Sequence, residues 1–319
     1  MSIVIVSSKN KGHYESYSKL VELILDRECK VVYKINIKEF LFAEKYIVID
    51  GDGVRLLLIL ITFLRSIRKC RTYFMSVRTE SFVSKGLYAR VKRFLLIVAK
   101  VQGYTRLISI HKGNSFVMDK LNSLDAVDYI YDPQLWDLGV FGKCEEKPSE
   151  LDIEGRKFLD GGKKVLLVLG ALNNKRSVDE LIAGLTELSK MYQFVFAGVI
   201  REEYLNKLYG HDIILINRYV TDEEIMYLYN MADIVYAYYA QDVNRPSGIF
   251  GRAVQLDKFV LIRKDGFLDQ QYGAYKYAIK VDSLSAIKID EQLIAKGESS
   301  EGVNASSFDD SVLLRRFLS

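Results

Sequence analysis

The chain has 319 residues, of which 49% are hydrophobic and 27% are charged, and this composition excludes a disordered, collagen-like or coiled-coil protein. Its length predicts about two domains, and its three widely spaced cysteines, Cys29, Cys70 and Cys144, predict neither a disulfide framework nor a zinc site. The net charge of +4 is unevenly divided: residues 1–140 hold 22 basic and 14 acidic side chains, and the remainder holds 23 and 27.

Short runs of β-branched residues alternate with segments of helical periodicity through the first half of the chain. The expected strands cover residues 2–6, 30–35, 45–50, 71–77, 106–111 and 128–132, and the expected helices cover 14–25, 54–69 and 83–100. Parallel strands need crossover connections, so this alternation predicts a doubly wound α/β domain.

The apolar segments near the N-terminus are short. Residues 2–6 form an apolar run with no basic residue before it, which is not typical of a secretory signal peptide. The longest apolar run, residues 56–64, has about half the length that a transmembrane helix needs. We therefore expect a cytoplasmic protein without a transmembrane helix.

Basic residues are concentrated in residues 51–100, where 11 Lys and Arg side chains face only Asp52 and Glu80. The two expected helices of this region are amphipathic and basic, and such helices suit the surface of an anionic bilayer. We expect residues 54–100 to contact the inner face of the cell membrane peripherally. The alternative is that both helices pack on the sheet and the cations are solvated. Recognition motifs for nucleic acid are absent from the sequence, so we expect no such partner.

The second half repeats the alternation of strand and helix. Its expected strands cover residues 164–170, 194–199, 213–217, 233–239 and 258–263, and its expected helices cover 177–191, 202–208, 221–230 and 249–256. Thr221 followed by Glu224 is a capping box, which marks a helix start. We place one Rossmann-like domain at residues 1–142, a polar linker at 143–162 and a second Rossmann-like domain at 163–319. A terminal helix can pack against either domain.

Two such domains in tandem predict a cleft facing the carboxyl ends of their strands, where open α/β sheets bind ligands. In the second domain, Lys175 and Arg176 lie just before a helix with Ser177 as its expected cap, and Ser247 and Gly248 begin another helix. Cations beside a helix N-terminus favour an anion, and a glycine allows close approach of the backbone. The alternative is a pair of solvated cations and an ordinary serine cap.

The order of these motifs carries a family resemblance. GALNNKRSVDELIAGL, then RYVTDEEIMYLYNMADIVYAYY, then PSGIFGRAVQLDKFVLIRKDG resembles the donor-binding domain of GT-B glycosyltransferases, such as glycosyltransferase family 4, over about residues 165–275. The resemblance implies that the first domain binds the acceptor and the second binds the nucleotide sugar.

The resemblance also implies site residues. Those expected beside the donor are Lys175, Arg176, Ser247 and Gly248 at the diphosphate, Arg252 one helical turn further on, and the backbone near Tyr219 at the nucleobase. The sequence departs from the family at the paired glutamates of its retaining members, where Gly248 and Leu256 stand instead. The departure leaves a retaining or an inverting outcome open.

Two of the three histidines follow expected strands of the first domain. His13 precedes the first helix, and its Gly-His dipeptide resembles the acceptor-side loop of inverting GT-B enzymes. His111 lies where retaining members hold a histidine beside the donor sugar. An imidazole with a pKa near neutrality can accept the proton of an attacking hydroxyl. Glu80, after another strand, is a third candidate base; the alternative for each is a purely local hydrogen bond or a helix-start carboxylate.

We predict a metal-independent glycosyltransferase of hexosyltransferase type that requires no cofactor. It transfers a sugar from a nucleotide-diphosphate donor to a hydroxyl of a lipid-linked saccharide in bacterial surface polysaccharide biosynthesis. Asp50 and Asp52 form the Asp-x-Asp pattern of metal-dependent GT-A enzymes, but the tandem α/β pattern and the absence of a second cluster of metal ligands in the sequence favour a turn that caps the helix starting near Val54. The alternatives are a sugar-nucleotide epimerase, a catalytically silent partner subunit and a membrane adaptor.

Overall fold

The chain divides into two compact units. The computed structural model describes residues 3–7, 13–49, 62, 64–76, 86–87, 90–91, 94, 97–98, 101, 103–110, 127–141, 162–173, 176–243, 246–284, 289–293 and 301–319. Unit 1 comprises Met1–Pro133, Gly139–Phe141 and Asp309–Ser319, and unit 2 comprises Gln134–Leu138 and Gly142–Phe308. The chain therefore changes unit first near Pro133, within the motif DPQLWDLG, and the last eleven residues belong to unit 1.

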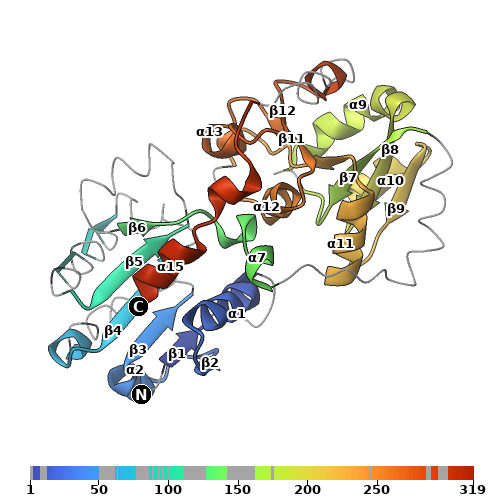
Figure 1. Cartoon of the computed structure of the whole chain (residues 1–319). Helices are drawn as coiled ribbons and strands as arrows, with labels where there is room; N and C mark the ends of the chain where they lie inside the picture. The colour runs from blue at the N-terminus through green and yellow to red at the C-terminus, as the bar shows by residue number, and fades with distance from the viewer. Residues whose placement is uncertain are drawn as a thin grey trace. The chain divides into compact units, whose positions relative to one another are not determined.

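Unit 1 is built on a parallel sheet with the order β2-β1-β3-β4-β5-β6 (Figure 1). The strands are β1 (Ile3–Val6), β2 (Cys29–Val32), β3 (Lys45–Val48), β4 (Arg71–Ser76), β5 (Thr105–Ser109) and β6 (Val127–Tyr129). Helices α1 (His13–Leu25), α2 (Ile37–Phe42) and α7 (Leu138–Phe141) belong to the same half of the chain. The central strands are buried on both faces, as their continuous apolar runs require.

Unit 2 repeats this plan with the strand order β12-β11-β10-β7-β8-β9, again all parallel. The strands are β7 (Lys164–Leu169), β8 (Tyr192–Ala197), β9 (Ile213–Ile216), β10 (Ile234–Tyr236), β11 (Phe259–Arg263) and β12 (Ala278–Val281). The helices are α9 (Val178–Met191), α10 (Glu202–Leu208), α11 (Asp222–Met231), α12 (Gly248–Gln255) and α13 (Phe267–Tyr272). Two doubly wound parallel sheets confirm the predicted α/β class.

The core of unit 2 forms where α9 packs on the sheet. The helix buries Val178, Leu181, Leu185 and Leu188, which recur at a spacing of three or four residues and so share one face. They join buried side chains of β7, β8 and β10, including Phe194.

Helix α15 (Ser311–Leu318) ends the chain and packs on unit 1, beside α1 (Figure 1). It buries Leu314 and Leu318. The Lys45 ammonium donates hydrogen bonds to the carbonyl oxygen of Leu318 at 2.8 Å and to a main-chain oxygen of Ser319, the last residue of the given sequence, at 3.0 Å. Just before the helix, Asp310 Oδ2 accepts a hydrogen bond from the backbone amide of Tyr131 at 2.7 Å.

The described part of the expected helix 54–69 buries polar side chains. Thr62, Arg65 and Ser66 are buried, whereas Leu64 is 54% exposed and Ile67 is 74% exposed. This segment therefore buries Arg65 and exposes Leu64 and Ile67 together with two further cations, Arg68 and Lys69.

The Arg65 guanidinium fits this interior because its donors have partners. It donates to Thr72 Oγ1 at 2.8 Å, to the carbonyl oxygen of Arg71 at 2.7 Å and to that of Phe40, and it lies 5.0 Å from the centre of the Phe40 ring. Burial lowers the pKa of Arg65 to about 10, so the side chain stays charged at neutral pH.

Among the helices of the described residues, none is long and apolar enough to cross a membrane.

Candidate nucleotide-binding site

The strand order of the unit 2 sheet has its topological switch point between β7 and β10. From β7 the chain adds β8 and β9 on one side, then returns to place β10, β11 and β12 on the other. Ligands of open α/β sheets bind outside the carboxyl ends of the strands at such a switch point. Gly170 follows β7 there with a φ of +89°, and a Cβ on Gly198 would lie 2.8 Å from the carbonyl carbon of Gly170. Both positions therefore need glycine.

Arg176 joins the two strands at this switch point. Its guanidinium donates a hydrogen bond to the carbonyl oxygen of Tyr236, the last residue of β10, at 2.8 Å, and another to that of Leu169, the last residue of β7. In return, the Tyr236 hydroxyl donates to the carbonyl oxygen of Arg176 at 2.8 Å. Burial raises the pKa of Tyr236, which keeps this hydroxyl a donor. Arg176 therefore connects the carboxyl ends of β7 and β10 through hydrogen bonds.

No acidic side chain in the part of the chain that the structure describes neutralises the charge of Arg176. The residue is 4% exposed, and no acidic partner lies within ion-pair distance among the residues described. Its Nε atom is buried and has no hydrogen-bond partner in the same set of residues. A buried cation is costly unless it is paired. An anion arriving at the switch point would supply both a counter-charge and an acceptor.

The first turn of α12 lies next to Arg176. A Cβ on Gly170 would sit 3.4 Å from Cδ1 of Ile249, in that turn, and 3.7 Å from Nη1 of Arg176. Ser247 is the N-cap of α12, and its Oγ accepts a hydrogen bond from the Phe250 amide at 3.3 Å. The first amides of a helix point outward and carry the positive end of its dipole. The geometry suits an anion.

Tyr239 connects these two parts of the site. Its ring centre lies 5.8 Å from the Arg176 guanidinium carbon, and its hydroxyl is 2.8 Å from Ser247 Oγ. Its backbone is held by Arg263, which donates to the carbonyl oxygen of Tyr239 at 2.8 Å. Arg176, Tyr239 and Ser247 therefore form one connected group after β7 and β10.

The other end of α12 contacts residues 134–138, the segment of unit 2 that leads into the first residue of α7. Arg252 donates to both carboxylate oxygens of Asp137, at 2.7 and 3.3 Å, and the Asp137 side chain is 1% exposed. Gln255 donates to the carbonyl oxygen of Gln134 at 2.7 Å and to Asp137 at 2.9 Å, and it accepts from the Leu138 amide at 2.8 Å. These contacts anchor the segment on the helix.

Two glycines of α12 allow this close packing, and they should differ in their tolerance of a methyl group. A Cβ on Gly251 would overlap the backbone of Gln134, 2.7 Å from its carbonyl carbon, whereas a Cβ on Gly248 would meet only the end of the Gln134 side chain. We expect Gly251→Ala to lower the free energy of unfolding by about 1–3 kcal/mol, as overpacking does. Gly248→Ala, the matched control, should cost clearly less. Urea unfolding measures both, and equal losses would contradict this packing.

The loop after β9 is fixed by an ion pair. Arg218 donates to the two carboxylate oxygens of Glu224 at 2.8 and 2.7 Å, and the Glu224 side chain is 4% exposed. Thr221 and Glu224 form the predicted capping box at the start of α11. Tyr219, which lies between Arg218 and Thr221, is 78% exposed, and its backbone carbonyl accepts a hydrogen bond from Arg218 at 3.1 Å. The Tyr219 backbone thus contacts the Arg218 side chain, and its own side chain faces solvent.

This ion pair predicts a specific dependence of stability on pH. The two hydrogen bonds from Arg218 hold the pKa of Glu224 below its usual range. The stabilisation is therefore complete above the pKa of an unfolded glutamate, about 4.3, and is lost as the pH falls through the lower folded value. The difference in urea midpoint between wild type and Arg218→Gln should be constant above about pH 5 and shrink below about pH 4. A constant difference down to pH 3 would contradict it. Arg201→Gln, which removes an exposed pair with Glu203, is the control.

The structure brings four of the predicted donor-site residues to α12 and the strand ends beside it: Arg176, Ser247, Gly248 and Arg252. Tyr219 follows the edge strand β9 instead. Ser177 is the N-cap of α9 as expected, but its side chain makes no capping hydrogen bond; its φ is +48°, and its Oγ accepts from Arg263 at 2.8 Å. The diphosphate contacts of all these residues stay predictions.

The other predicted residues lie wholly or partly outside the described set. Lys175, Glu80 and His111 are outside it, as are Asp50 and Asp52. His13 is the first residue of α1, which follows β1, but its side chain is also outside the described part. Within that part, no group of three or more His, Cys, Asp or Glu side chains is placed to hold a metal ion. The need for a metal therefore stays untested.

Sequence reasoning missed the partners of α12 and of Tyr239. Gln134 and Asp137 lie more than 110 residues before the helix they contact, and no local pattern marks them. Arg263 is the last residue of β11, yet it donates to Tyr239, Ser177 and Glu180. Its position at a strand end, where ligand-binding loops begin, was the one available signal.

No family model matches the chain, and no curated protein matches its sequence. Solved structures do match. Anabaena HepE in complex with UDP and glucose superposes with a TM-score of 0.62 at 11% identity, over 100% of this chain and 98% of that one. A putative UDP-N-acetylglucosamine 2-epimerase from Listeria monocytogenes gives 0.60 at 11% identity, over 100% and 95%. Sucrose-phosphate synthase from Thermosynechococcus elongatus gives 0.59 at 11% identity, over 99% and 97%. The chain has the GT-B fold, which confirms the predicted resemblance.

Proposed function

We propose that the chain is a glycosyltransferase that uses a UDP-linked sugar, with the donor diphosphate bound at the switch point of unit 2. The observation that carries the proposal is Arg176, a buried guanidinium without an acidic partner among the described residues, whose Nε lacks an acceptor there. The choice of UDP is supported by HepE, which has the same fold and is solved with UDP and glucose.

The leaving diphosphate would be stabilised by fixed donors. The first amides of α12, set by the Ser247 cap, and the Arg176 guanidinium act on charge that grows as the bond to the anomeric carbon breaks. Because these donors are held by the fold, they need little reorganisation during the reaction. Lys175 adds a further cation in this scheme. Arg252 acts through Asp137 by positioning the helix, and no metal or cofactor is required.

The attacking hydroxyl needs a base, and we assign it to His13. The assignment is supported by the chain order: α1 begins at His13 and follows β1, and the first sheet has its switch point between β1 and β3. A neutral imidazole accepts the acceptor's proton as the sugar transfers. His111 and Glu80 remain candidates for the same role. In this scheme His13→Ala abolishes transfer and leaves UDP affinity unchanged.

The acceptor in this proposal is a lipid-linked saccharide, and unit 1 offers a surface for the membrane that holds it. The segment that buries Arg65 exposes Leu64 and Ile67, and further along the chain Leu87 and Phe94 are 77% and 64% exposed. Basic residues are frequent between these positions. Exposed apolar side chains among cations suit an anionic bilayer. The protein then works peripherally at the inner face of the cell membrane.

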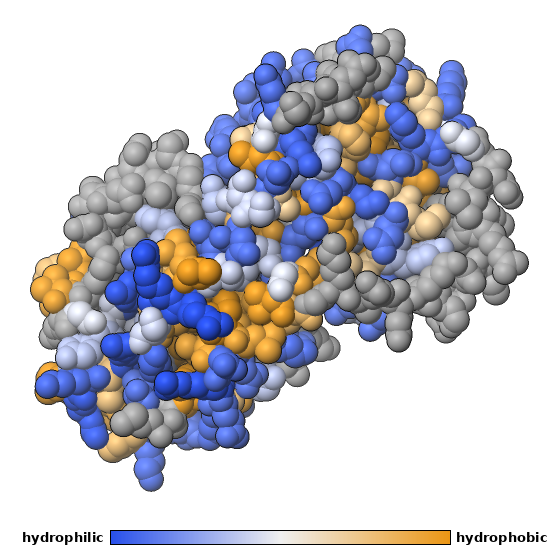
Figure 2. Space-filling view, in the orientation of Figure 1, coloured by the Kyte–Doolittle hydropathy of each residue, from blue (hydrophilic) through white to orange (hydrophobic). Residues whose placement is uncertain are grey.

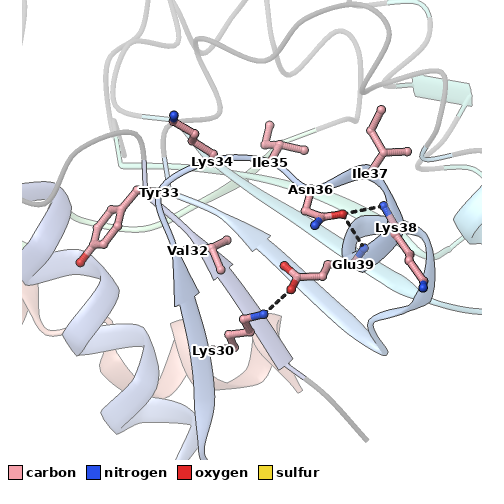
Figure 3. Close-up of a pocket in the computed structure, with 9 residues that line it drawn as sticks. All are labelled: Lys30, Val32, Tyr33, Lys34, Ile35, Asn36, Ile37, Lys38 and Glu39. Carbon is pink, nitrogen blue, oxygen red and sulfur yellow. Dashed lines mark hydrogen bonds and ion pairs between the residues drawn. The ribbon is translucent and has the colours of Figure 1, made fainter.

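The connection from β2 to α2 also exposes apolar side chains beside a cation. Lys34, Ile35 and Ile37 point to one side of it in Figure 3, and the two isoleucines are 42% and 53% exposed. Asn36 fixes the turn by accepting hydrogen bonds from the amides of Lys38 and Glu39, at 3.0 and 3.3 Å. Ile35→Ser with Ile67→Ser should release the protein from vesicles of anionic lipid, whereas Val312→Ser, an exposed change on α15, should not. Equal binding by all variants would contradict membrane contact.

The activity is tested by incubating the protein with radiolabelled UDP-sugars and a membrane lipid extract. The expected result is transfer of label to the lipid fraction by the wild type and its loss in His13→Ala. If UDP binds but label never leaves the nucleotide with any sugar tested, the transferase proposal is wrong.

A second candidate is a sugar-nucleotide epimerase, which the fold of the Listeria protein favours. An epimerase converts the UDP-sugar without an acceptor, so NMR of UDP-N-acetylglucosamine with the protein alone separates the two. A new UDP-linked sugar in that sample identifies an epimerase. A catalytically silent subunit or a membrane adaptor would give neither product.

A further inference from the structure

The side chain of Gln134 lies against the first turn of α12. A Cβ on Gly248, the first residue of that helix, would lie 2.9 Å from Cδ of Gln134 and would overlap its Oε1. The Gln134 carboxamide therefore occupies the space that a side chain at position 248 would need. Gln134 itself is half-buried.

The backbone of Gln134 is held on the same face of α12. Gly248, Gly251 and Gln255 recur at a spacing of three or four residues and so share one face of the helix. Gln255 donates to the carbonyl oxygen of Gln134 at 2.7 Å, and a Cβ on Gly251 would lie 2.7 Å from the carbonyl carbon of Gln134. With its backbone beside Gly251 and Gln255, the Gln134 side chain extends toward the N-terminal end of the helix.

Arg176 and Gln134 approach this first turn from different directions. A Cβ on Gly170 would lie 3.4 Å from Cδ1 of Ile249 and 3.7 Å from Nη1 of Arg176, which places Arg176 on the Ile249 side of the turn. Gln134 lies on the Gly248 side. Successive residues of a helix are rotated by about 100°. A ligand held by the first amides of α12 would therefore have a buried cation on one side and a neutral carboxamide on the other.

We propose that Gln134 binds the sugar of the nucleotide donor, an inference that rests on the proposed function. The diphosphate carries the negative charge and belongs beside Arg176, whose buried Nε has no acceptor among the described residues. Sugar hydroxyl groups are neutral and both donate and accept hydrogen bonds, as a carboxamide does. Figure 2 shows mostly hydrophilic residues on the described surface of unit 2, with apolar residues in small groups, which suits a polar ligand. Gln134 is then a determinant of sugar specificity.

A purely structural role of Gln134 predicts a different result. If the side chain only packs on α12, its loss lowers the stability of the helix and weakens UDP and UDP-sugars alike. If it contacts the sugar, its loss weakens UDP-sugars and leaves UDP unchanged. The ratio of the dissociation constants of UDP-sugar and UDP separates the two roles, because a general loss of stability does not change this ratio.

The ratio is measured by calorimetry with UDP, UDP-glucose, UDP-galactose and UDP-N-acetylglucosamine. In Gln134→Met the side chain keeps its unbranched shape but loses its amide donor and acceptor. We expect this variant to bind one or more UDP-sugars about tenfold more weakly, because a hydrogen bond is lost, and to bind UDP as the wild type does. Gln193→Met, at a half-buried glutamine near the amino end of β8, is the matched control and should leave every ratio unchanged.

A second variant tests the same contact with Gln134 intact. Gly248→Ala places a methyl group where the Gln134 carboxamide lies, so it should raise the same ratio. The inference is overturned if UDP binds but Gln134→Met leaves the ratio unchanged for every sugar, or if Gly248→Ala alone changes it. If the wild type does not bind UDP at all, the proposed function is contradicted instead, so the two failures are distinguishable.

Discussion

Replacing Arg176 with methionine is expected to lower the free energy of unfolding by about 3 kcal/mol, because the carbonyl oxygens at the ends of β7 and β10 lose their buried donors. The same variant should lose most of its affinity for UDP. Urea unfolding and calorimetry measure the two effects separately.

The variant Arg176→Lys separates the effect of the hydrogen bonds to Leu169 and Tyr236 from the effect of the positive charge. Lysine keeps the charge but lacks the planar fork that reaches two carbonyl oxygens at once. We expect it to destabilise the protein nearly as much as methionine does while keeping part of the UDP affinity. A fully stable Arg176→Lys protein would show that the contacts to Leu169 and Tyr236 contribute little.

The second large effect is expected at Asp137. Truncation to alanine leaves the Arg252 guanidinium beside a buried cavity without its counter-charge, and breaking a buried pair in this way costs about 3–5 kcal/mol. Gln255 loses an acceptor in the same change. Urea unfolding of Asp137→Ala measures the loss.

Asp179→Ala is the matched control, because Asp179 pairs with Lys207 at 2.9 Å in the same unit but both side chains are more than half exposed. It should cost far less stability than Asp137→Ala, because solvent screens an exposed pair. The double variant Asp137→Leu with Arg252→Met replaces the pair by apolar groups and should recover much of the stability. If Asp137→Ala is no worse than Asp179→Ala, residues 134–138 are not anchored as described.

The elements of the fold could be predicted because they depend on local patterns. The apolar runs give the strands, and the spacing of Val178, Leu181, Leu185 and Leu188 gives α9. The capping box at Thr221 and Glu224 needs only residues three apart, and the structure confirms it. Position along the chain also placed Ser247 at the start of α12.

The direction of the charged side chains could not be predicted in this way. Arg65 belongs to the expected helix 54–69, for which we expected membrane contact and took solvated cations as the alternative, but its partners, Phe40 and Thr72, come from other elements. The sequence predicts Arg176 as a cation in the loop before a helix, yet Tyr236, 60 residues later, supplies one of its hydrogen-bond acceptors. The contact of Arg252 with Asp137 spans 115 residues. Periodicity identifies the exposed face of an element but not the distant atoms that make burial of a charge favourable.

The central claim is that a nucleoside diphosphate binds at the switch point of unit 2, and thermal unfolding with UDP, UMP and uridine tests it most directly. At about a hundred times its dissociation constant, a ligand adds roughly 2.7 kcal/mol to the folded state, a rise in Tm on the order of 5 °C. We expect UDP to stabilise the wild type more than UMP does, uridine to have little effect, and Arg176→Met to lose the response. If UDP leaves Tm unchanged at millimolar concentration, and GDP, CDP, dTDP and ADP do the same, the donor site does not exist.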